Sequence, residues 1–172
     1  MDLTILIPTR IETEDRLRNI ISSVSYLLKN VPAKVIVKEV SDQNTFKFRA
    51  LPEIKKYADT VHLTHLYEQS DDPLFCKSKV LNDLIVAADT NVVANYDADC
   101  ILPIDAYRQA YNAIQDNQLD VVYPYQCGIY QWKADYSMDI YNSFIQNLST
   151  DVLDKSKTLS NSTIGWSQFI RR

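Results

Sequence analysis

Residues 3–40 read LTILIPTRIETEDRLRNIISSVSYLLKNVPAKVIVKEV, and this stretch decides the fold class. The run from Leu3 to Ile7 is almost entirely apolar, which is typical of a parallel strand covered on both faces. Between Leu17 and Leu28 the apolar residues recur on one helical face, and Thr13 is a suitable N-cap. Residues 34–40 are again rich in β-formers. The order strand, helix, strand predicts a βαβ unit with a right-handed crossover.

The rest of the chain continues this alternation of strands and helices. The periodicity predicts strands at 61–67, 92–94, 119–123 and 164–170, helices at 51–59, 76–88, 103–114 and 138–152, and a loop at 154–162. Strands that alternate with helices form a mostly parallel sheet with helices on both faces. We therefore predict the α/β class, as a single three-layer α/β/α domain over residues 1–172.

Length and composition limit the functions that the chain can have. With 172 residues, the chain can bury the core of one domain. A net charge of -4 gives no drive toward nucleic acid. No apolar stretch reaches the ~18 residues that a transmembrane helix needs, and the N-terminus lacks the basic start of a signal peptide. Three widely spaced cysteines fit reduced thiols, so we expect a cytoplasmic protein.

The glycine content excludes two common nucleotide sites. Only Gly128 and Gly165 are present. Dinucleotide-binding and P-loop motifs need several glycines, because backbone N–H groups must approach the phosphates closely. A phosphate-containing ligand therefore needs basic side chains or a metal instead.

The acidic motif at Asp97 and Asp99 is the strongest candidate for chemistry. It follows the apolar run 92–94, at the point where a strand is expected to end. Two carboxylates cannot be buried there without a positive partner. A divalent cation such as Mg²⁺ or Mn²⁺, shared with substrate phosphates, would be a suitable partner. The alternative is a polar turn before the helix that Pro103 opens.

Other polar residues follow the predicted strands in the same way. Pro8, Thr9 and Arg10 end the first strand, and residues 39–42 end the second. In open α/β sheets, ligands bind beyond the carboxyl ends of the strands. These residues and the acidic motif are therefore expected to lie at one edge of the sheet.

The ordered motifs resemble those of one family. They are Ile-Pro-Thr-Arg at residues 7–10, an acidic residue ending the second strand, Lys-Ser-Lys-Val-Leu-Asn at 77–82, and Asp-Ala-Asp at 97–99. Together they resemble the GT-A fold glycosyltransferases of the family 2 type, in particular the bacterial branch associated with capsule and cell-surface polysaccharide. The resemblance covers roughly residues 3–125.

The resemblance implies transfer of a hexose, with inversion, from a nucleotide-diphospho-sugar, preferably a UDP-sugar, to a glycan acceptor. Residues implied to contact the donor are Pro8, Thr9 and Arg10 around the nucleoside, Glu39 at the base or ribose, Lys77 and Lys79 near the nucleotide, and Asp97 at the ribose or a metal-bound water. Asp99 would hold Mn²⁺ or Mg²⁺ against the diphosphate, with Asp97 beside it.

Several of these residues have structural alternatives. Arg10 could pair with Glu12 or Glu14 at the surface. Lys77 and Lys79 are two residues apart on a helix, so they face different directions and at least one is expected to be solvated.

Other residues have equally ordinary alternatives. Glu39 could be a strand-end charge. The aromatic residues at 123–125 and Trp132 could stack on a sugar, but we favour a place in the core. His62 and His65 would point to opposite faces of a strand, and we expect them at the surface or the sheet edge.

The final stretch departs from the family pattern. Residues 164–172 resemble the strand near the acceptor, but no later acidic residue can act as general base. We expect the N-terminal part of a longer enzyme, with any peripheral membrane association coming through other regions, or else a domain that binds donor without transferring it. A haloacid-dehalogenase-type phosphatase is a third reading of the acidic motif, although Ile101 replaces the usual Thr.

Overall fold

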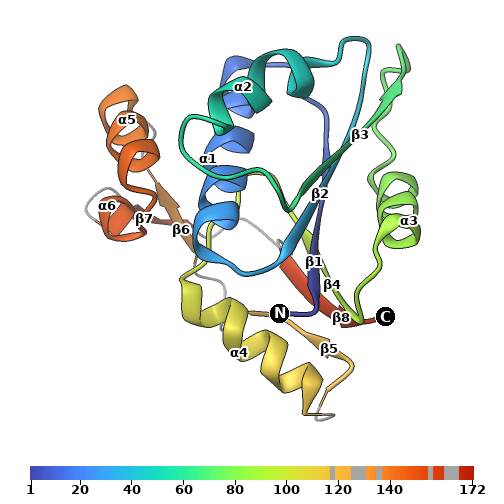
Figure 1. The fold of residues 1–172 in the computed structure, drawn as a ribbon. Helices are drawn as coiled ribbons and strands as arrows, with labels where there is room; N and C mark the ends of the chain where they lie inside the picture. Colours follow the sequence, from blue (N-terminus) through green and yellow to red (C-terminus); the bar gives the residue numbers. More distant parts are fainter. Residues whose placement is uncertain (117–118, 125–130, 135–136, 155–156, 161–166) are drawn as a thin grey trace.

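A six-stranded sheet in the order β3-β2-β1-β4-β8-β5 forms the centre of the computed structural model (Figure 1). The structure describes residues 1–116, 119–124, 131–134, 137–154, 157–160 and 167–172. The strands are β1 (Leu3–Thr9), β2 (Lys34–Ser41), β3 (Leu63–Gln69), β4 (Val92–Tyr96), β5 (Val121–Val122) and β8 (Ser167–Arg171). The first four are parallel to one another, and β8 runs antiparallel to both β4 and β5. The predicted mostly parallel sheet is therefore confirmed.

Helices cover both faces of this sheet. They are α1 (Glu14–Asn30), the π-helix η1 (Phe46–Ala50), α2 (Leu51–Ile54), α3 (Lys77–Ala87), α4 (Ile104–Gln115), α5 (Met138–Asn147) and α6 (Asp151–Asp154). Residues of α1, α2, α4 and α5 share one large core with β1, β2 and β4. A smaller core lies between α3 and the opposite face. The predicted three layers are present (Figure 1).

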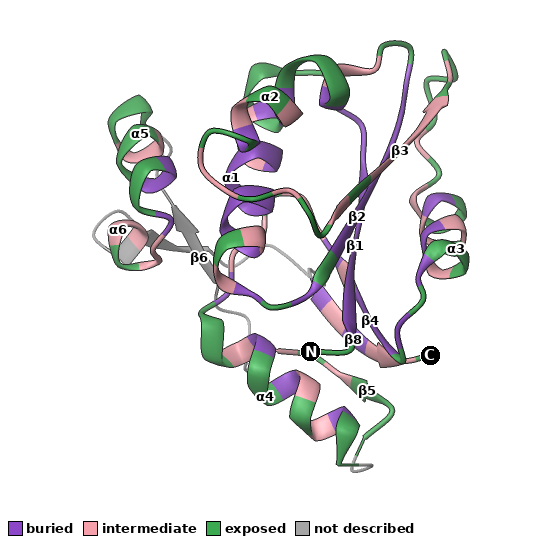
Figure 2. Cartoon of the chain, viewed as in Figure 1, coloured by how far each residue is buried: buried purple, intermediate pink, exposed green. Residues whose placement is uncertain are grey.

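Successive side chains of β1 face opposite sides of the sheet, and both sides are covered, which explains its continuous apolar sequence. Leu3, Ile5 and Ile7 belong to the core beneath α1, whereas Leu6 belongs to the core beneath α3. Figure 2 shows the central strands as buried along most of their length. A strand covered on both faces has no position left for exposed polar side chains, as the sequence pattern predicts.

The predicted start of α1 is confirmed. The Thr13 side chain accepts a hydrogen bond from the Arg16 backbone N–H over 3.3 Å, and Glu14 and Asp15 place negative charge in the first turn. Both features stabilise a helix N-terminus, because they satisfy a free N–H group and complement the helix dipole.

The predictions fail most in the last third of the chain. The predicted loop at 154–162 contains β7 (Lys157–Ser160), which pairs antiparallel with β6 (Gln131–Ala134). The sequence of β7 has no local strand pattern. Only its pairing with β6 defines it as a strand. The predicted helix at 138–152 is split at Leu148, which has a left-handed backbone with φ of 50°. Residues 161–166, the start of the predicted last strand, lie outside the described residues.

Two earlier boundaries also differ. The short helix predicted at 51–59 begins at Leu51 as α2 but ends at Ile54, and the π-helix η1 precedes it from Phe46. Strand β3 begins at Leu63, so His62 precedes the strand. No helix among the described residues has both the length and the apolar character needed to cross a membrane.

Candidate functional site

The acidic motif lies directly beyond the carboxyl end of β4. Asp97 is partly buried and Asp99 is exposed. The ammonium group of Lys77, in the first turn of α3, contacts Oδ1 of Asp97. The positive partner that the sequence requires for Asp97 is therefore a lysine of the chain itself.

Burial and Lys77 act on Asp97 in opposite directions. Burial raises the pKa of the Asp97 carboxyl above its ordinary value, and the Asp99 charge adds to this rise. The hydrogen bond and charge of Lys77 lower the pKa of Asp97, but they only partly offset the burial. A nearby cation therefore favours the ionised form of the Asp97 carboxyl, which burial disfavours.

Three buried tyrosines hold the turn that follows the carboxylates. Tyr96 donates to the Cys100 carbonyl over 2.8 Å, and its hydroxyl lies 2.5 Å from that of Tyr107. Tyr107 accepts from the Leu102 backbone N–H over 3.2 Å, while Tyr26 donates to the Leu102 carbonyl over 2.8 Å. Because Tyr96 uses its proton on a carbonyl, Tyr107 must donate to Tyr96. We call these three residues the tyrosine clasp.

Helix α1 adds one further contact to this turn. Ser23 donates from its hydroxyl to the Ala98 carbonyl over 2.7 Å, between the two carboxylates. Neither Ser23 nor the tyrosine clasp is predicted as part of the site, because no motif marks these residues and their role depends on packing between α1, β4 and α4. The one available signal was the hydroxyl that each brings into an apolar setting, since a buried hydroxyl needs a partner.

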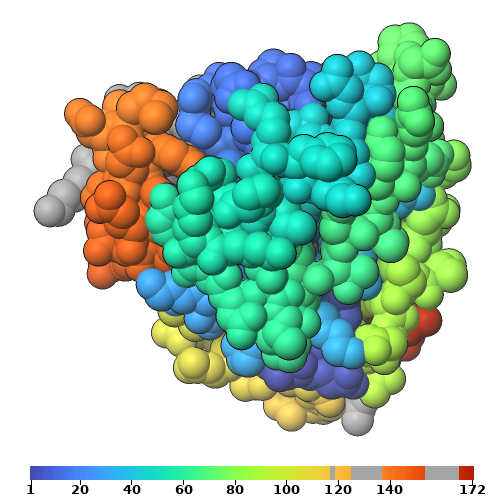
Figure 3. Space-filling model, turned by 45° about the horizontal axis from the view of Figure 1, so that its top comes forward, coloured from blue at the N-terminus to red at the C-terminus, as the bar shows by residue number. Residues whose placement is uncertain are grey.

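A polar cavity of about 660 Å³ lies at the same edge of the sheet, beyond β1, β2 and β3. Figure 3, which brings the top of Figure 1 forward, shows these blue, cyan and green segments side by side. The lining residues are those at 10–14, 41–43, 45, 49 and 70–73. The cavity is therefore made by three loops, at the place where an open α/β sheet binds ligands.

Arg10 joins the walls of this cavity. Its Nε donates to the Val40 carbonyl over 3.0 Å, and its two terminal nitrogens donate to the carbonyls of Asp72 and Pro73 over 2.5 and 3.2 Å. The guanidinium also lies 5.9 Å from the centre of the Phe75 ring. Arg10 is therefore largely used in holding the loops after β2 and β3 together.

The alternative pairing of Arg10 is wrong. Glu12 pairs with Arg16 over 3.5 Å, and Glu14 pairs with Arg49 over 2.8 Å. The other two residues of the predicted nucleoside group, Pro8 and Thr9, are buried in β1 and do not line the cavity.

Glu39 is fully buried and faces the protein interior. Its Oε2 accepts from the Phe46 backbone N–H over 2.9 Å, at the start of η1, and lies 3.9 Å from Nε2 of His65. Burial raises the pKa of Glu39, although the Phe46 hydrogen bond opposes the rise. Glu39 acts here as a helix cap, and the predicted contact with a base or ribose would require it to move.

His65 departs from its expected surface role. Its ring stacks on Phe46 with 4.6 Å between the ring centres, and burial, together with the Lys47 charge, lowers the pKa of His65. It does lie on the edge strand β3, as one form of the prediction stated.

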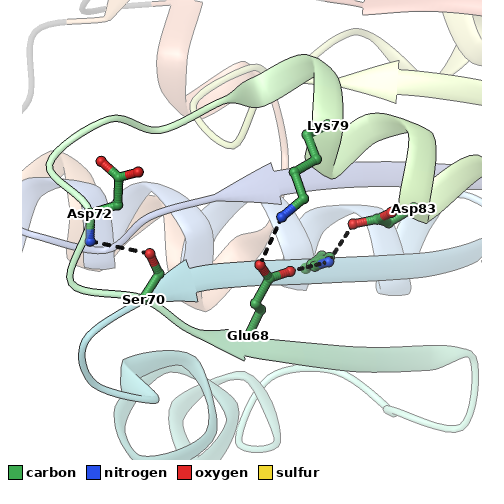
Figure 4. A network of polar contacts seen from close by, with 6 residues as sticks. Glu68, Ser70, Asp72, Lys79 and Asp83 are labelled. Carbon is green, nitrogen blue, oxygen red and sulfur yellow. Dashed lines mark hydrogen bonds and ion pairs between the residues drawn. The ribbon is translucent and has the colours of Figure 1, made fainter.

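The structure separates Lys79 from Lys77. Lys79 Nζ lies 3.1 Å from Glu68 Oε1, and Lys38 contacts Glu68 and Asp83 over 2.7 and 2.6 Å (Figure 4). Lys79 therefore belongs to a charge network between α3 and β3. The expectation that Lys77 and Lys79 face different directions is confirmed.

The predicted aromatic core positions are only partly described. Tyr123 is 52% exposed, so the prediction that it is a core residue is wrong. Tyr125 lies outside the described residues, and Trp132 lies in β6.

Asp97 and Asp99 match the donor set that a Mg²⁺ or Mn²⁺ ion takes when it is shared with substrate phosphates. Such ions use one or two carboxylates and complete their shell with water and phosphate oxygens. Within the described part of the chain, no cluster of three His, Cys, Asp or Glu side chains could hold a metal by itself. The residues therefore fit a cation that arrives with its substrate better than a permanently bound ion.

No protein-family model matches the chain, and no curated protein matches it by sequence. Solved structures match its fold. TarS 1–349 from S. aureus has a TM-score of 0.57 and 17% identity, covering 99% of this chain and 47% of that one. The mannosyltransferase PcManGT from Pyrobaculum calidifontis, solved with GDP-Man and Mn²⁺, has a TM-score of 0.52 and 21% identity, with coverages of 70% and 34%.

A third similar structure is glucosyl-3-phosphoglycerate synthase from Mycobacterium tuberculosis, solved with Mn²⁺, UDP and phosphoglyceric acid. Its TM-score is 0.52 at 14% identity, and the match covers 98% of this chain and 55% of that one. The chain thus spans 34% to 55% of these three proteins. It shares its fold with the GT-A glycosyltransferases, which confirms the predicted fold type.

Proposed function

We propose that the chain is the donor-binding domain of a metal-dependent glycosyltransferase, which takes a hexose from a nucleotide-diphospho-sugar, preferably a UDP-sugar. One observation carries this proposal. Two carboxylates follow the central strand β4 at the sheet edge that also holds the polar cavity, on a fold shared with glycosyltransferases. The acceptor would be a glycan, as the motif resemblance to polysaccharide-forming enzymes suggests.

In this proposal the cavity binds the nucleoside of the donor, and the two carboxylates bind its diphosphate through a metal ion. The cavity is lined mainly by neutral and acidic residues, so it suits a nucleoside, whose hydroxyl and N–H groups donate to such acceptors. Asp99 and Asp97 would hold Mn²⁺ or Mg²⁺ beside the diphosphate. A divalent cation stabilises the negative charge that grows on a nucleoside diphosphate as the glycosidic bond breaks.

A domain that binds donor without transferring the sugar is the second candidate. Such a domain would use the cavity and the two carboxylates for the donor but would lack a general base for the acceptor hydroxyl. A general base must come within about 3 Å of the acceptor hydroxyl. A phosphatase is less well supported, since the similar structures are glycosyltransferases.

Calorimetric titration tests the proposal. UDP, UDP-sugars and GDP-sugars are titrated into the protein with Mn²⁺ and again with EDTA. We expect binding of at least one nucleotide sugar that requires the metal. If none binds at millimolar concentration with Mn²⁺ present, the proposal fails. Binding followed by no sugar transfer or donor hydrolysis would instead favour the second candidate.

A further inference from the structure

The ion pair between Lys77 and Asp97 occupies one of the two carboxylates proposed to receive a cation. Lys77 is 41% exposed and Asp97 24% exposed on their side chains, so the pair is open to solvent on one side. Asp99 has no ion pair within the described part of the chain. The motif therefore contains one carboxylate already neutralised and one that is still available.

A lysine and a divalent cation cannot share this carboxylate without cost. Two positive charges a few ångströms apart repel, and the repulsion is stronger where solvent is partly excluded. Lysine is suited to leaving, because its charge is carried at the end of a flexible four-carbon chain and needs only some acceptor oxygen. The oxygens of a diphosphate provide such an acceptor.

From this geometry we propose that Lys77 is a resident counter-ion that holds Asp97 before ligands arrive, leaves it when a divalent cation binds, and then contacts the diphosphate of the donor. This inference rests on the proposed function and adds a positioning role for one residue. Lys77 thereby weakens cation binding until a diphosphate is present.

The consequence is coupling between metal and donor. Without nucleotide, part of the cation's binding energy is used to displace Lys77 from Asp97. With nucleotide, Lys77 regains an ion pair with phosphate. Each ligand therefore strengthens the binding of the other, and by linkage the two effects are equal in size.

Lys79 supplies a matched control. It lies two residues further along α3, carries the same charge, and is held by Glu68 rather than by the acidic motif (Figure 4). Changing either lysine to glutamine removes one positive charge from the same helix. A difference between the two variants cannot come from net charge alone.

The test compares wild type, Lys77→Gln and Lys79→Gln in two titrations. Free Mn²⁺ is followed by electron paramagnetic resonance without nucleotide, and UDP is titrated by calorimetry at saturating Mn²⁺. We expect Lys77→Gln to bind Mn²⁺ about fivefold more tightly and UDP about fivefold more weakly, the size of one partly exposed ion pair. Lys79→Gln should stay within about twofold of wild type in both.

Opposite signs in the two titrations are the signature of displacement. A purely structural Lys77 would weaken both ligands together when replaced. Unchanged or weaker Mn²⁺ binding by Lys77→Gln would overturn the inference.

Lys77→Arg keeps the charge and should retain the wild-type affinity for Mn²⁺. It serves as a second variant if Lys77→Gln unfolds, and an affinity raised like that expected for glutamine would also overturn the inference. Wild-type protein that binds neither Mn²⁺ nor UDP would contradict the proposed function itself.

Discussion

At the scale of single residues, two charged side chains that were expected to contact a ligand form hydrogen bonds with the backbone instead. Arg10 and Glu39 were both predicted to touch the nucleotide, yet Arg10 donates to three backbone carbonyls and Glu39 accepts from one backbone N–H. A motif identifies which residues gather at the edge of the sheet. It does not show whether each one faces outward.

Replacing Arg10 by alanine should lower the stability of the whole domain. The change leaves the carbonyls of Val40, Asp72 and Pro73 without their donor, and hydrogen bonds to a charged group contribute about 1.5–3 kcal/mol. We expect a loss of about 3 kcal/mol in the free energy of unfolding, measured by urea denaturation.

The control for this change is Arg49→Ala. Arg49 also lines the cavity, but its partner Glu14 is exposed, so only a small change is expected. Equal losses for the two variants would show that Arg10 does not hold the loops together.

Replacing Glu39 by glutamine should stabilise the protein at neutral pH. Burial raises the pKa of Glu39 in the folded state above its ordinary value of 4.5, so the folded state binds this proton more tightly than the unfolded state. The resulting stabilisation is complete below about pH 4.5 and is lost as the pH rises through the raised pKa. Glutamine keeps an oxygen for the Phe46 N–H without the charge.

The measurement is the unfolding temperature of both proteins from pH 4 to pH 8. We expect Glu39→Gln to be a few degrees more stable at pH 7, with the difference closing toward pH 4. His65 lies 3.9 Å from Glu39, and burial lowers the pKa of His65 from 6.5, so the ring is mainly neutral at pH 7, where the two proteins are compared. A variant that is less stable at pH 7 would mean that the charge of Glu39 favours the fold.

At the scale of elements, the acidic motif depends on three other segments. Helix α1 contributes Tyr26 and Ser23, β4 contributes Tyr96, and α4 contributes Tyr107 to the turn that bears Asp97 and Asp99. The chain of hydroxyls in the tyrosine clasp leaves both polar groups of Leu102 satisfied. The turn is thus fixed from the core side, while its carboxylates remain accessible.

Removing one hydroxyl from the tyrosine clasp should weaken the turn. Tyr107→Phe leaves the Leu102 N–H without its acceptor in a buried setting, which costs about 1–3 kcal/mol. We expect this loss in chemical denaturation, together with weaker Mn²⁺ binding in the presence of UDP.

Tyr111→Phe on the same helix is the matched control. The Tyr111 hydroxyl accepts from the exposed Asp2 N–H, which water can satisfy instead. If both variants lose the same stability and the same Mn²⁺ affinity, the clasp has no special role.

The same elements show how far the sequence alone could lead. The strands β1, β2 and β4 and the helices α1, α3 and α4 were all predicted, because each combines a strong period with an end signal such as Thr13 or Pro103. β7 was missed because only its pairing with β6 makes it a strand. The acidic motif and Lys77 could be nominated, but the Lys77–Asp97 contact joins residues 20 apart, and Ser23 and Tyr26 reach the turn from 75 and 76 residues away.

At the scale of the whole molecule, the parallel strands bring the polar cavity and the acidic motif to one edge of the sheet. The cavity beyond β1 to β3 and the acidic motif beyond β4 lie next to each other in strand order, because β1 is hydrogen-bonded to both β2 and β4. Arg10 and the loop at 70–73 then connect the cavity to the start of α3, where Lys77 lies. This arrangement supports a donor that extends from a nucleoside pocket to a metal-diphosphate site.

The most direct test of this account is UDP binding by wild type, Asp99→Asn and Asp105→Asn, each titrated with Mn²⁺ and with EDTA. Asp105 is an exposed residue of α4 that pairs with Arg108, so its replacement removes the same charge away from the motif. We predict Mn²⁺-dependent binding by wild type and Asp105→Asn, and binding on the order of tenfold weaker by Asp99→Asn. Equal binding by all three proteins, or binding that EDTA does not affect, would contradict a metal-diphosphate site at Asp97 and Asp99.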